Sequence, residues 1–118
     1  MVADCVPCLQ LNTHKAQLAH IELLHVLDEH PETICLIQEP YTVKNRLVTL
    51  PREADCYPRE VESPCTAVFV PKRLRSKGLP QFTDCDCTAA LIPGSPQPII
   101  IASVYMDCLL YTSPSPRD

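Results

Sequence analysis

The sequence is short of glycine, lacks tryptophan and contains no long apolar run. Of its 118 residues two are Gly, none is Trp and 13 are Pro. No apolar stretch approaches the roughly 20 residues that a membrane-spanning helix needs, so we expect no membrane partner. The N-terminus has neither a basic region nor a long apolar core, which argues against a signal peptide. We therefore expect an intracellular location with a reducing environment.

Positive charge is also in short supply. The formal net charge is −4 at pH 7, which argues against a protein that binds nucleic acid by electrostatic attraction alone. A nuclease that uses a metal ion escapes this argument, because the cation offsets the carboxylates that hold it. One basic cluster is present, at Lys72, Arg73, Arg75 and Lys77. We interpret it as a solvated loop in preference to a loop that contacts phosphates.

Cysteine, in contrast, is abundant. The eight cysteines are expected to be free thiols in a reducing compartment. The spacing of Cys5 and Cys8, and of Cys85 and Cys87, leaves open a small cysteine-based zinc or interaction module. Neither pair is accompanied by a Cys/His pair at zinc-knuckle spacing, so this hypothesis is the less favoured one.

The first third of the chain predicts a strand, a helix and a second strand. An apolar strand over residues 6–11 or 8–12 leads to a helix capped by Asn12 or Thr13 and ending near Glu29. One helix face, expected to cover a sheet, carries the apolar side chains of Ala16, Ala19, Leu23, Val26 and Leu27. A strand over 33–38 follows, and a right-handed crossover would make the two strands parallel neighbours.

The rest of the chain predicts three more strands. Residues 40–63 are polar and broken by prolines, which predicts a long connection that lies over the functional edge. Strands are expected over 66–70, 88–92 and 99–105. The last two are separated by a Pro- and Gly-containing turn and should form an antiparallel hairpin. We expect all five strands in one mixed sheet, with one sheet face left apolar and open.

Polar residues follow two of these strands at the point where each strand ends. The apolar run over 34–38 ends at Glu39, and Pro40 then stops the strand because it has no N–H to donate. Asn12 ends the first strand in the same way. Ligands and metals bind at the carboxyl ends of strands in open α/β sheets. We therefore expect Asn12 and Glu39 to lie side by side at one edge.

The order of three motifs carries a resemblance to a known family. The motifs are Leu9–Asn12, Leu36–Tyr41 and Ala102–Asp107. Together they resemble the endonuclease/exonuclease/phosphatase family, which has the deoxyribonuclease I-like fold. More narrowly, they are similar to the endonuclease domain at the start of non-LTR (LINE-type) retrotransposon polyproteins. Residues 66–70 and 82–89 fit the family's next two strands, so the resemblance runs from about residue 8 to residue 107.

The resemblance implies a fold class and a division of the chain. The fold would be α/β (α+β), a partial four-layer α/β sandwich with one mixed sheet and a covering helix, truncated. Residues 1–107 would be the N-terminal half of such a domain. Residues 108–118 break the strand pattern and back-translate to a sequencing-library adapter, so we interpret them as an artefact. Asp107 stands where many relatives have Pro.

The resemblance also implies a chemistry. Glu39 matches the family's metal-binding carboxylate, and Asn12 matches the amide that supports the metal and the scissile phosphate. Tyr105 matches a tyrosine whose hydroxyl faces that phosphate. The implied cofactor is Mg²⁺ or Mn²⁺, and the implied reaction nicks target DNA in retrotransposition. For the full-length element a downstream reverse transcriptase and a nuclear location are expected.

Two family motifs are missing from the sequence. The family orients the attacking water and meets the charge on phosphorus with an Asp-x-Asn pair and a late Asp-His pair. This sequence contains neither, and its four His all lie at or before residue 30. We therefore predict a fragment of a metal-dependent DNA endonuclease that is inactive by itself.

Simpler interpretations of the three candidate residues stay open. Asn12 fits a helix cap, Glu39 a solvated strand end, and Tyr105 a packing residue with its hydroxyl at the surface. Asp86 matches a recurrent family Asp and could simply hydrogen-bond a turn. Within the same fold, a repair nuclease or a phosphatase is the alternative to the retrotransposon endonuclease.

Overall fold

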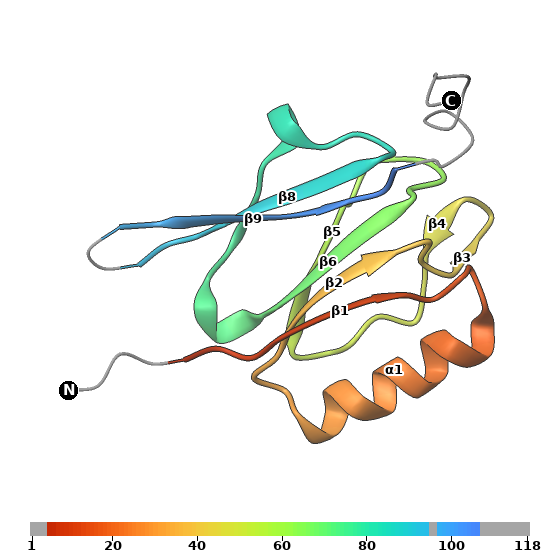
Figure 1. Cartoon of the computed structure of the whole chain (residues 1–118), viewed down its shortest axis with the longest axis horizontal. Coiled ribbons are helices and arrows are strands. Elements are labelled where there is room, and N and C mark those ends of the chain that lie inside the picture. Colours follow the sequence, from red (N-terminus) through yellow and green to blue (C-terminus); the bar gives the residue numbers. More distant parts are fainter. Residues whose placement is uncertain (1–4, 95–96, 107–118) are drawn as a thin grey trace, which may run out of the picture.

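A computed structural model describes residues 5–94 and 97–106 of the chain (Figure 1). The motif residues from 107 onward and the suspected artefact at 108–118 lie outside the described part. The elements, in chain order, are β1 (Cys8–Asn12), α1 (Gln17–Glu29), β2 (Ile34–Gln38), β3 (Thr42–Val43), β4 (Arg46–Leu47), β5 (Ala54–Tyr57), β6 (Thr66–Pro71), β7 (Lys77–Gly78), β8 (Cys87–Ile92) and β9 (Ile99–Val104). Two 3₁₀ turns flank β7, at Lys72–Leu74 and Pro80–Phe82.

The first sheet has four strands in the order β1-β2-β6-β5. β1 and β2 are parallel, while β6 runs antiparallel to both of its neighbours. Parallel neighbours need a crossover connection, and α1 supplies it. The predicted mixed sheet with one covering helix is therefore confirmed.

Helix α1 covers one face of this four-stranded sheet, as Figure 1 shows. Leu23 and Leu27 pack there against Cys35, Ile37 and Phe69. The predicted helix face is only partly right. The buried residues are His20, Leu23 and Leu27, three and four positions apart as one helix face requires, whereas Val26 is 44% exposed.

The predicted start of the helix is wrong. Its N-cap is Ala16, and no side chain caps it. Asn12 and Thr13 lie upstream, in the turn between β1 and α1. The Asn12 side chain bonds within that turn, whereas the Thr13 hydroxyl bonds the carbonyl oxygen of Glu39, which follows β2.

A second sheet covers the other face of the first. It has three strands in the order β7-β8-β9. Ala90 and Ile92 of β8 join Ile34, Val68 and Val70 of the first sheet in a second apolar cluster. The expectation of a single sheet is wrong for β8 and β9, and so is the expectation that the first sheet has an open face. The antiparallel β8–β9 hairpin itself is confirmed.

The connection over residues 40–63 contains more structure than expected. β3 and β4 form a two-stranded hairpin, with Lys44 and Asn45 at positive φ angles of 53° and 67°. Two such residues are typical of the tight turn that matches strand twist. β5 then pairs with β6 at the edge of the first sheet. Within the described residues, no helix is long and apolar enough to span a bilayer.

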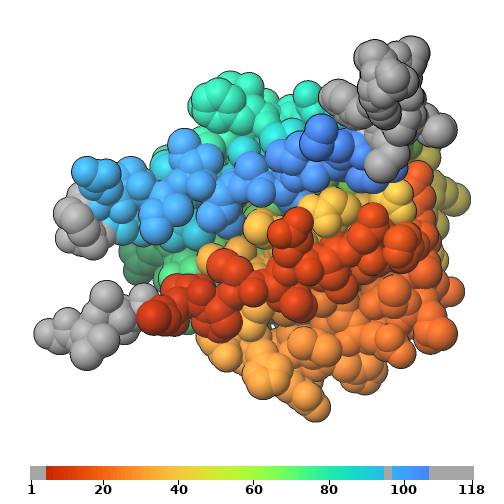
Figure 2. Space-filling model, in the orientation of Figure 1, coloured from red at the N-terminus to blue at the C-terminus, as the bar shows by residue number. Residues whose placement is uncertain are grey.

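Apolar surface is left open on the outside of the second sheet. Side chains alternate between the faces of a strand, so Ser103 points inward and is buried while Ile100 and Val104 point outward. The two outward residues are 57% and 53% exposed. Figure 2 shows β9 (blue) running along the surface of the molecule.

Candidate functional site

The parallel pairing of β1 and β2 places two polar residues at one edge. Asn12 is opposite Gln38 in the register, and Glu39 is the next residue. Both strands therefore end together, with Asn12 and Glu39 at the edge that we call the candidate edge. This placement agrees with the expectation from the sequence, while the chemical roles of the two residues stay predictions.

Asn12 organises the turn that follows β1. Its Oδ1 accepts a hydrogen bond from the backbone N–H of His14 at 2.7 Å. His14 and Lys15 have positive φ angles of 54° and 58°, a region that non-glycine residues seldom occupy. The Asn12 side chain therefore belongs to the turn and not to a helix cap, and its amide oxygen lies at the edge.

Glu39 is held through its backbone by three neighbours. Its N–H donates to the carbonyl oxygen of Cys65 at 2.8 Å. Its own carbonyl oxygen accepts from the Thr13 hydroxyl at 2.7 Å and from the Lys15 N–H at 2.8 Å. Glu39 also has a positive φ, of 54°. Its position at the candidate edge is thus fixed from both sides.

The Glu39 carboxylate lies beside His14. The distance from Glu39 Oε1 to His14 Nδ1 is 3.5 Å, with the side chains 23% and 78% exposed. His14 is not among the candidate residues predicted from the sequence. His14 precedes the helix, and only the left-handed turn brings it to Glu39. The signal available in the sequence was its position two residues after Asn12.

Backbone hydrogen bonds also bring Tyr105 to this edge. The Tyr105 N–H donates to the carbonyl oxygen of Asp86 at 2.9 Å, and the Cys65 N–H donates to that of Cys85 at 2.6 Å. Since Cys65 also binds Glu39, the segment before β8 connects Tyr105 to Glu39. The turn around Asp86 is itself closed by Asp84, whose Oδ1 accepts the Asp86 N–H at 2.8 Å.

Buried side chains fix the two sheets relative to each other near the same edge. The Ser103 hydroxyl donates to the carbonyl oxygen of Ile37 at 2.9 Å and accepts from Gln38 Nε2 at 3.2 Å. The hydroxyls of Thr66 and Thr88, both fully buried, are 2.7 Å apart. Ser103 lies two residues before Tyr105, and Gln38 directly precedes Glu39. The contacts of Ser103 therefore set the spacing between Tyr105 and Glu39.

Three residues at the candidate edge have left-handed backbone conformations. Of the eight non-glycine residues with positive φ among the described residues, His14, Lys15 and Glu39 lie at the candidate edge. Such conformations cost about 1–3 kcal/mol each and cluster at functional sites. Positive φ angles at His14, Lys15 and Glu39 thus occur beside the candidate residues.

The donors at the edge suit a hard cation. Mg²⁺ binds oxygen ligands, and one or two carboxylates with water and substrate phosphate often suffice. The Glu39 carboxylate and the Asn12 amide oxygen provide such donors. Among residues 5–94 and 97–106, no group of three or more His, Cys, Asp or Glu is placed to hold a metal ion. A closed set of four protein ligands, which a structural zinc site requires, is therefore not found among these residues.

The surroundings of three cysteines near the candidate edge disfavour the thiolate form. Burial and the Asp86 carboxylate raise the pKa of the Cys65 and Cys85 thiols. Burial and Asp84 raise the pKa of Cys87. Zinc binds the thiolate form, so these shifts give no support to the cysteine-based module.

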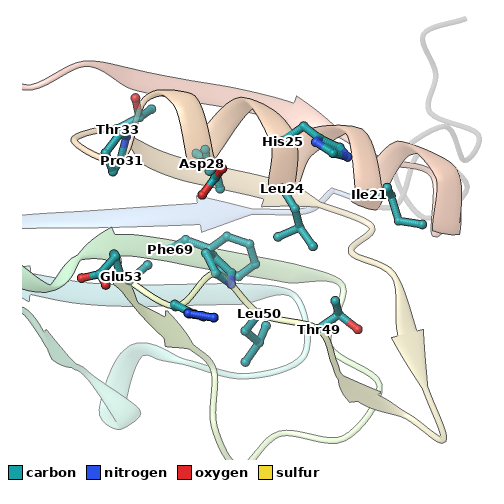
Figure 3. A pocket seen from close by; sticks show the side chains of 14 residues that line it. Ile21, Leu24, His25, Asp28, Pro31, Thr33, Thr49, Leu50, Glu53 and Phe69 are labelled. Atoms are coloured by element: carbon teal, nitrogen blue, oxygen red, sulfur yellow. The ribbon is translucent and has the colours of Figure 1, made fainter.

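Two other features lie away from the candidate edge. The basic residues from Lys72 to Lys77 follow the far end of β6, because Thr66 at its near end pairs with Gln38. A cavity of about 600 Å³ opens between α1 and residues 49–54. Figure 3 shows Leu24, Leu50 and Phe69 around it. None of the three candidate residues lines this cavity.

The chain was compared with known proteins at the level of sequence and of structure. No protein family and no curated protein matches the sequence. Among solved structures, the chain is similar to the endonuclease domain of TRAS1, a telomere-specific non-LTR retrotransposon, with a TM-score of 0.65 and 24% identity. The match covers 83% of this chain and 43% of the other. The chain therefore has the fold of part of that endonuclease domain and spans less than half of its length.

Proposed function

We propose that this chain carries the metal-binding part of a DNA endonuclease site. The observation that supports the proposal is the position of Asn12 and Glu39 at the same end of the parallel strands β1 and β2, with the segment that bonds Tyr105 also bonded to Cys65, the partner of Glu39. The fold shared with a retrotransposon endonuclease domain favours DNA as the substrate. Nicking of target DNA in retrotransposition is the activity we infer for the complete domain, with a reverse transcriptase as partner and the nucleus as location.

In this proposal each residue has a distinct task. Glu39 and Asn12 hold a divalent cation, Mg²⁺ or Mn²⁺, by their oxygen atoms. The bound cation would polarise a phosphoryl oxygen and stabilise the leaving group. Tyr105 presents its hydroxyl to the phosphate. The strained turn of His14 and Lys15 and the left-handed Glu39 keep these groups in place before substrate arrives.

We further propose that the chain alone does not cleave DNA. The sequence contains no Asp-x-Asn and no Asp-His pair, so no such groups orient the attacking water or meet the charge on phosphorus. Groups that act as a unit are not replaced by the survivors when some are absent. We therefore expect this protein to bind the metal ion without cleaving DNA.

Two measurements on residues 1–107 and 1–118 test the proposal. Mn²⁺ titration followed by electron paramagnetic resonance should show binding that Glu39→Gln weakens about 10-fold or more. Glu29→Gln, an exposed carboxylate on the far end of α1, is the matched control and should leave binding unchanged. Plasmid nicking with Mg²⁺ should be absent.

Two outcomes contradict the proposal. Mn²⁺ binding that is equal in the wild type and Glu39→Gln would remove Glu39 from the site. Mg²⁺-dependent nicking that Glu39→Ala abolishes would show that the missing motifs are dispensable. A chain extended by the genomic sequence downstream of residue 107 should gain nicking activity.

A further inference from the structure

Thr13 has an unusual environment for a residue in a turn. Its side chain is 1% exposed, although its neighbours Asn12 and His14 are both exposed. Its hydroxyl donates to the carbonyl oxygen of Glu39 at 2.7 Å, and its N–H donates to that of Gln38 at 3.0 Å. Helix capping does not explain this hydroxyl, because α1 begins after Ala16.

Glu39 needs such support because its conformation is doubly unfavourable. Its φ of 54° lies in the left-handed region, which costs a residue with a Cβ about 1–2 kcal/mol. Pro40 follows, and a residue before proline is normally pushed into extended conformations. The strand would therefore tend to continue straight past Gln38. The bonds from Thr13 and Lys15 to the Glu39 carbonyl oppose that tendency.

The bend at Glu39 determines where its carboxylate lies. In the bent conformation the carboxylate is 3.5 Å from His14, beside the turn that carries Asn12. An extended Glu39 would send its side chain elsewhere, because side chains alternate along a strand. The two proposed oxygen donors therefore share one edge only while Glu39 stays bent.

We propose that Thr13 is a positioning residue that holds Glu39 bent and so keeps its carboxylate beside Asn12. The inference rests on the proposed function, since it concerns the metal affinity of that site. Thr13 touches neither metal nor phosphate in this account and acts only through the Glu39 backbone. Buried groups that orient metal ligands usually change metal affinity by about 10–100-fold when they are removed.

The test measures the Mn²⁺ affinity of the full chain by electron paramagnetic resonance, with the urea midpoint recorded for each variant. Thr13→Val keeps the shape but loses the hydroxyl and should bind Mn²⁺ about 10-fold more weakly or worse. Thr13→Ser keeps the hydroxyl and should bind within about 3-fold of the wild type, because the hydrogen bond remains.

Thr88→Val is the matched control. Thr88 is a fully buried threonine whose hydroxyl bonds Thr66 away from the Asn12 turn. It should lose stability but keep the wild-type Mn²⁺ affinity. Should Thr13→Val fail to fold, Thr13→Ala takes its place under the same criterion.

The outcomes separate the two proposals. Wild-type affinity in Thr13→Val, with affinity lost in Glu39→Gln, overturns the role of Thr13 and leaves the metal site intact. Equal affinity in the wild type and Glu39→Gln, or no saturable Mn²⁺ binding by the wild type, overturns the site itself. An equal loss in Thr13→Val and Thr88→Val would reduce Thr13 to a structural residue and contradict the inference.

Discussion

The two sheets share one apolar layer but differ on their outer faces. The four-stranded sheet is covered on its outside by α1, where Leu23 and Leu27 are 3% and 6% exposed. Among the residues that the structure describes, none covers the outside of β9 in this way, and Ile100 is 57% exposed. All six residues of β6 are buried, whereas only Ser103 is buried in β9. Stability should therefore reside mainly around β6.

The exposed strand also lacks the usual protection of a sheet edge. Edge strands are normally shielded by charged residues, prolines or bulges that prevent pairing with other chains. β9 reads Ile-Ile-Ile-Ala-Ser-Val and carries no charge. The face of the four-stranded sheet under α1 therefore stabilises the fold. The outer face of β9 contributes little to stability and is open to association with other chains.

The largest difference in unfolding free energy between the two sheets should come from truncating an apolar side chain on each outer face. Leu27→Ala creates a cavity under α1 and should cost about 2–5 kcal/mol of unfolding free energy. Val104→Ala removes methyl groups that are already half in water and should change stability by about 0.5 kcal/mol or less. Urea unfolding followed by circular dichroism measures both. Equal losses would mean that the outside of β9 is covered in solution.

Alkaline pH should weaken the α1 side selectively. Burial raises the pKa of Cys35 to about 12, with Cys56 as the second cause, and burial followed by Asp55 does the same for Cys56. The unfolded thiols titrate near 9.0, so the unfolded chain loses protons first. Stability is complete below pH 9 and falls as pH rises toward 12, by about 1.4 kcal/mol per pH unit for each thiol.

The measurement is the urea midpoint between pH 8 and 10.5, over roughly one decade on either side of the unfolded pKa. The double variant Cys35→Ala and Cys56→Ala should flatten the alkaline decline, and Cys8→Ala, at an exposed position in β1, is the matched control. An unchanged slope in the double variant would assign the decline to other groups.

Loss of one hydroxyl from the contact between Thr66 and Thr88, which joins the two sheets, should lower the free energy of unfolding. Thr66→Val leaves the Thr88 hydroxyl, which also lies 3.3 Å from the Thr66 carbonyl oxygen, without its 2.7 Å partner. Because the longer bond to that carbonyl oxygen remains, we expect a cost of about 0.5–1.5 kcal/mol, the net contribution of one hydrogen bond. The double variant with Thr88→Val should cost less than the sum of the two single variants, because both remove the same bond between hydroxyls. Strict additivity in this cycle would show that the two hydroxyls do not interact.

The sequence predicts the α1 side of the molecule better than the second sheet. Helix periodicity and an apolar strand on each side define the β1–α1–β2 unit, and the crossover rule makes its strands parallel. The β8–β9 hairpin is predicted equally well from its turn. The sheet to which the hairpin belongs is not predicted, because it depends on contacts between residues far apart in the chain, such as Ser103 with Ile37.

Short strands and the turn at the site are not predictable from sequence patterns, for a different reason. β5 has four residues, Ala54–Tyr57, in a polar segment, and only its pairing with β6 makes it a strand. Asn12 and Glu39 are predictable because they end parallel strands. His14 is not, because a left-handed turn places it, and side-chain spacing along a helix does not describe that turn.

The smallest expected effect on stability comes from adding a charge to the open face. Ile100→Lys places an ammonium group outside β9, where the Lys stem can lie along the apolar surface and the charge stays in water. Unfolding free energy should change by about 0.5 kcal/mol or less, and self-association should decrease because a charged edge resists pairing.

Ile101→Lys is the control: Ile101 points inward onto the cluster of Val68 and Ala90, so an uncompensated charge there should destabilise the fold strongly. Sedimentation velocity and urea midpoints report both properties. A large loss of stability in Ile100→Lys would show that the outside of β9 is as much a part of the core as the face under α1, and the contrast between the two sheets would fail.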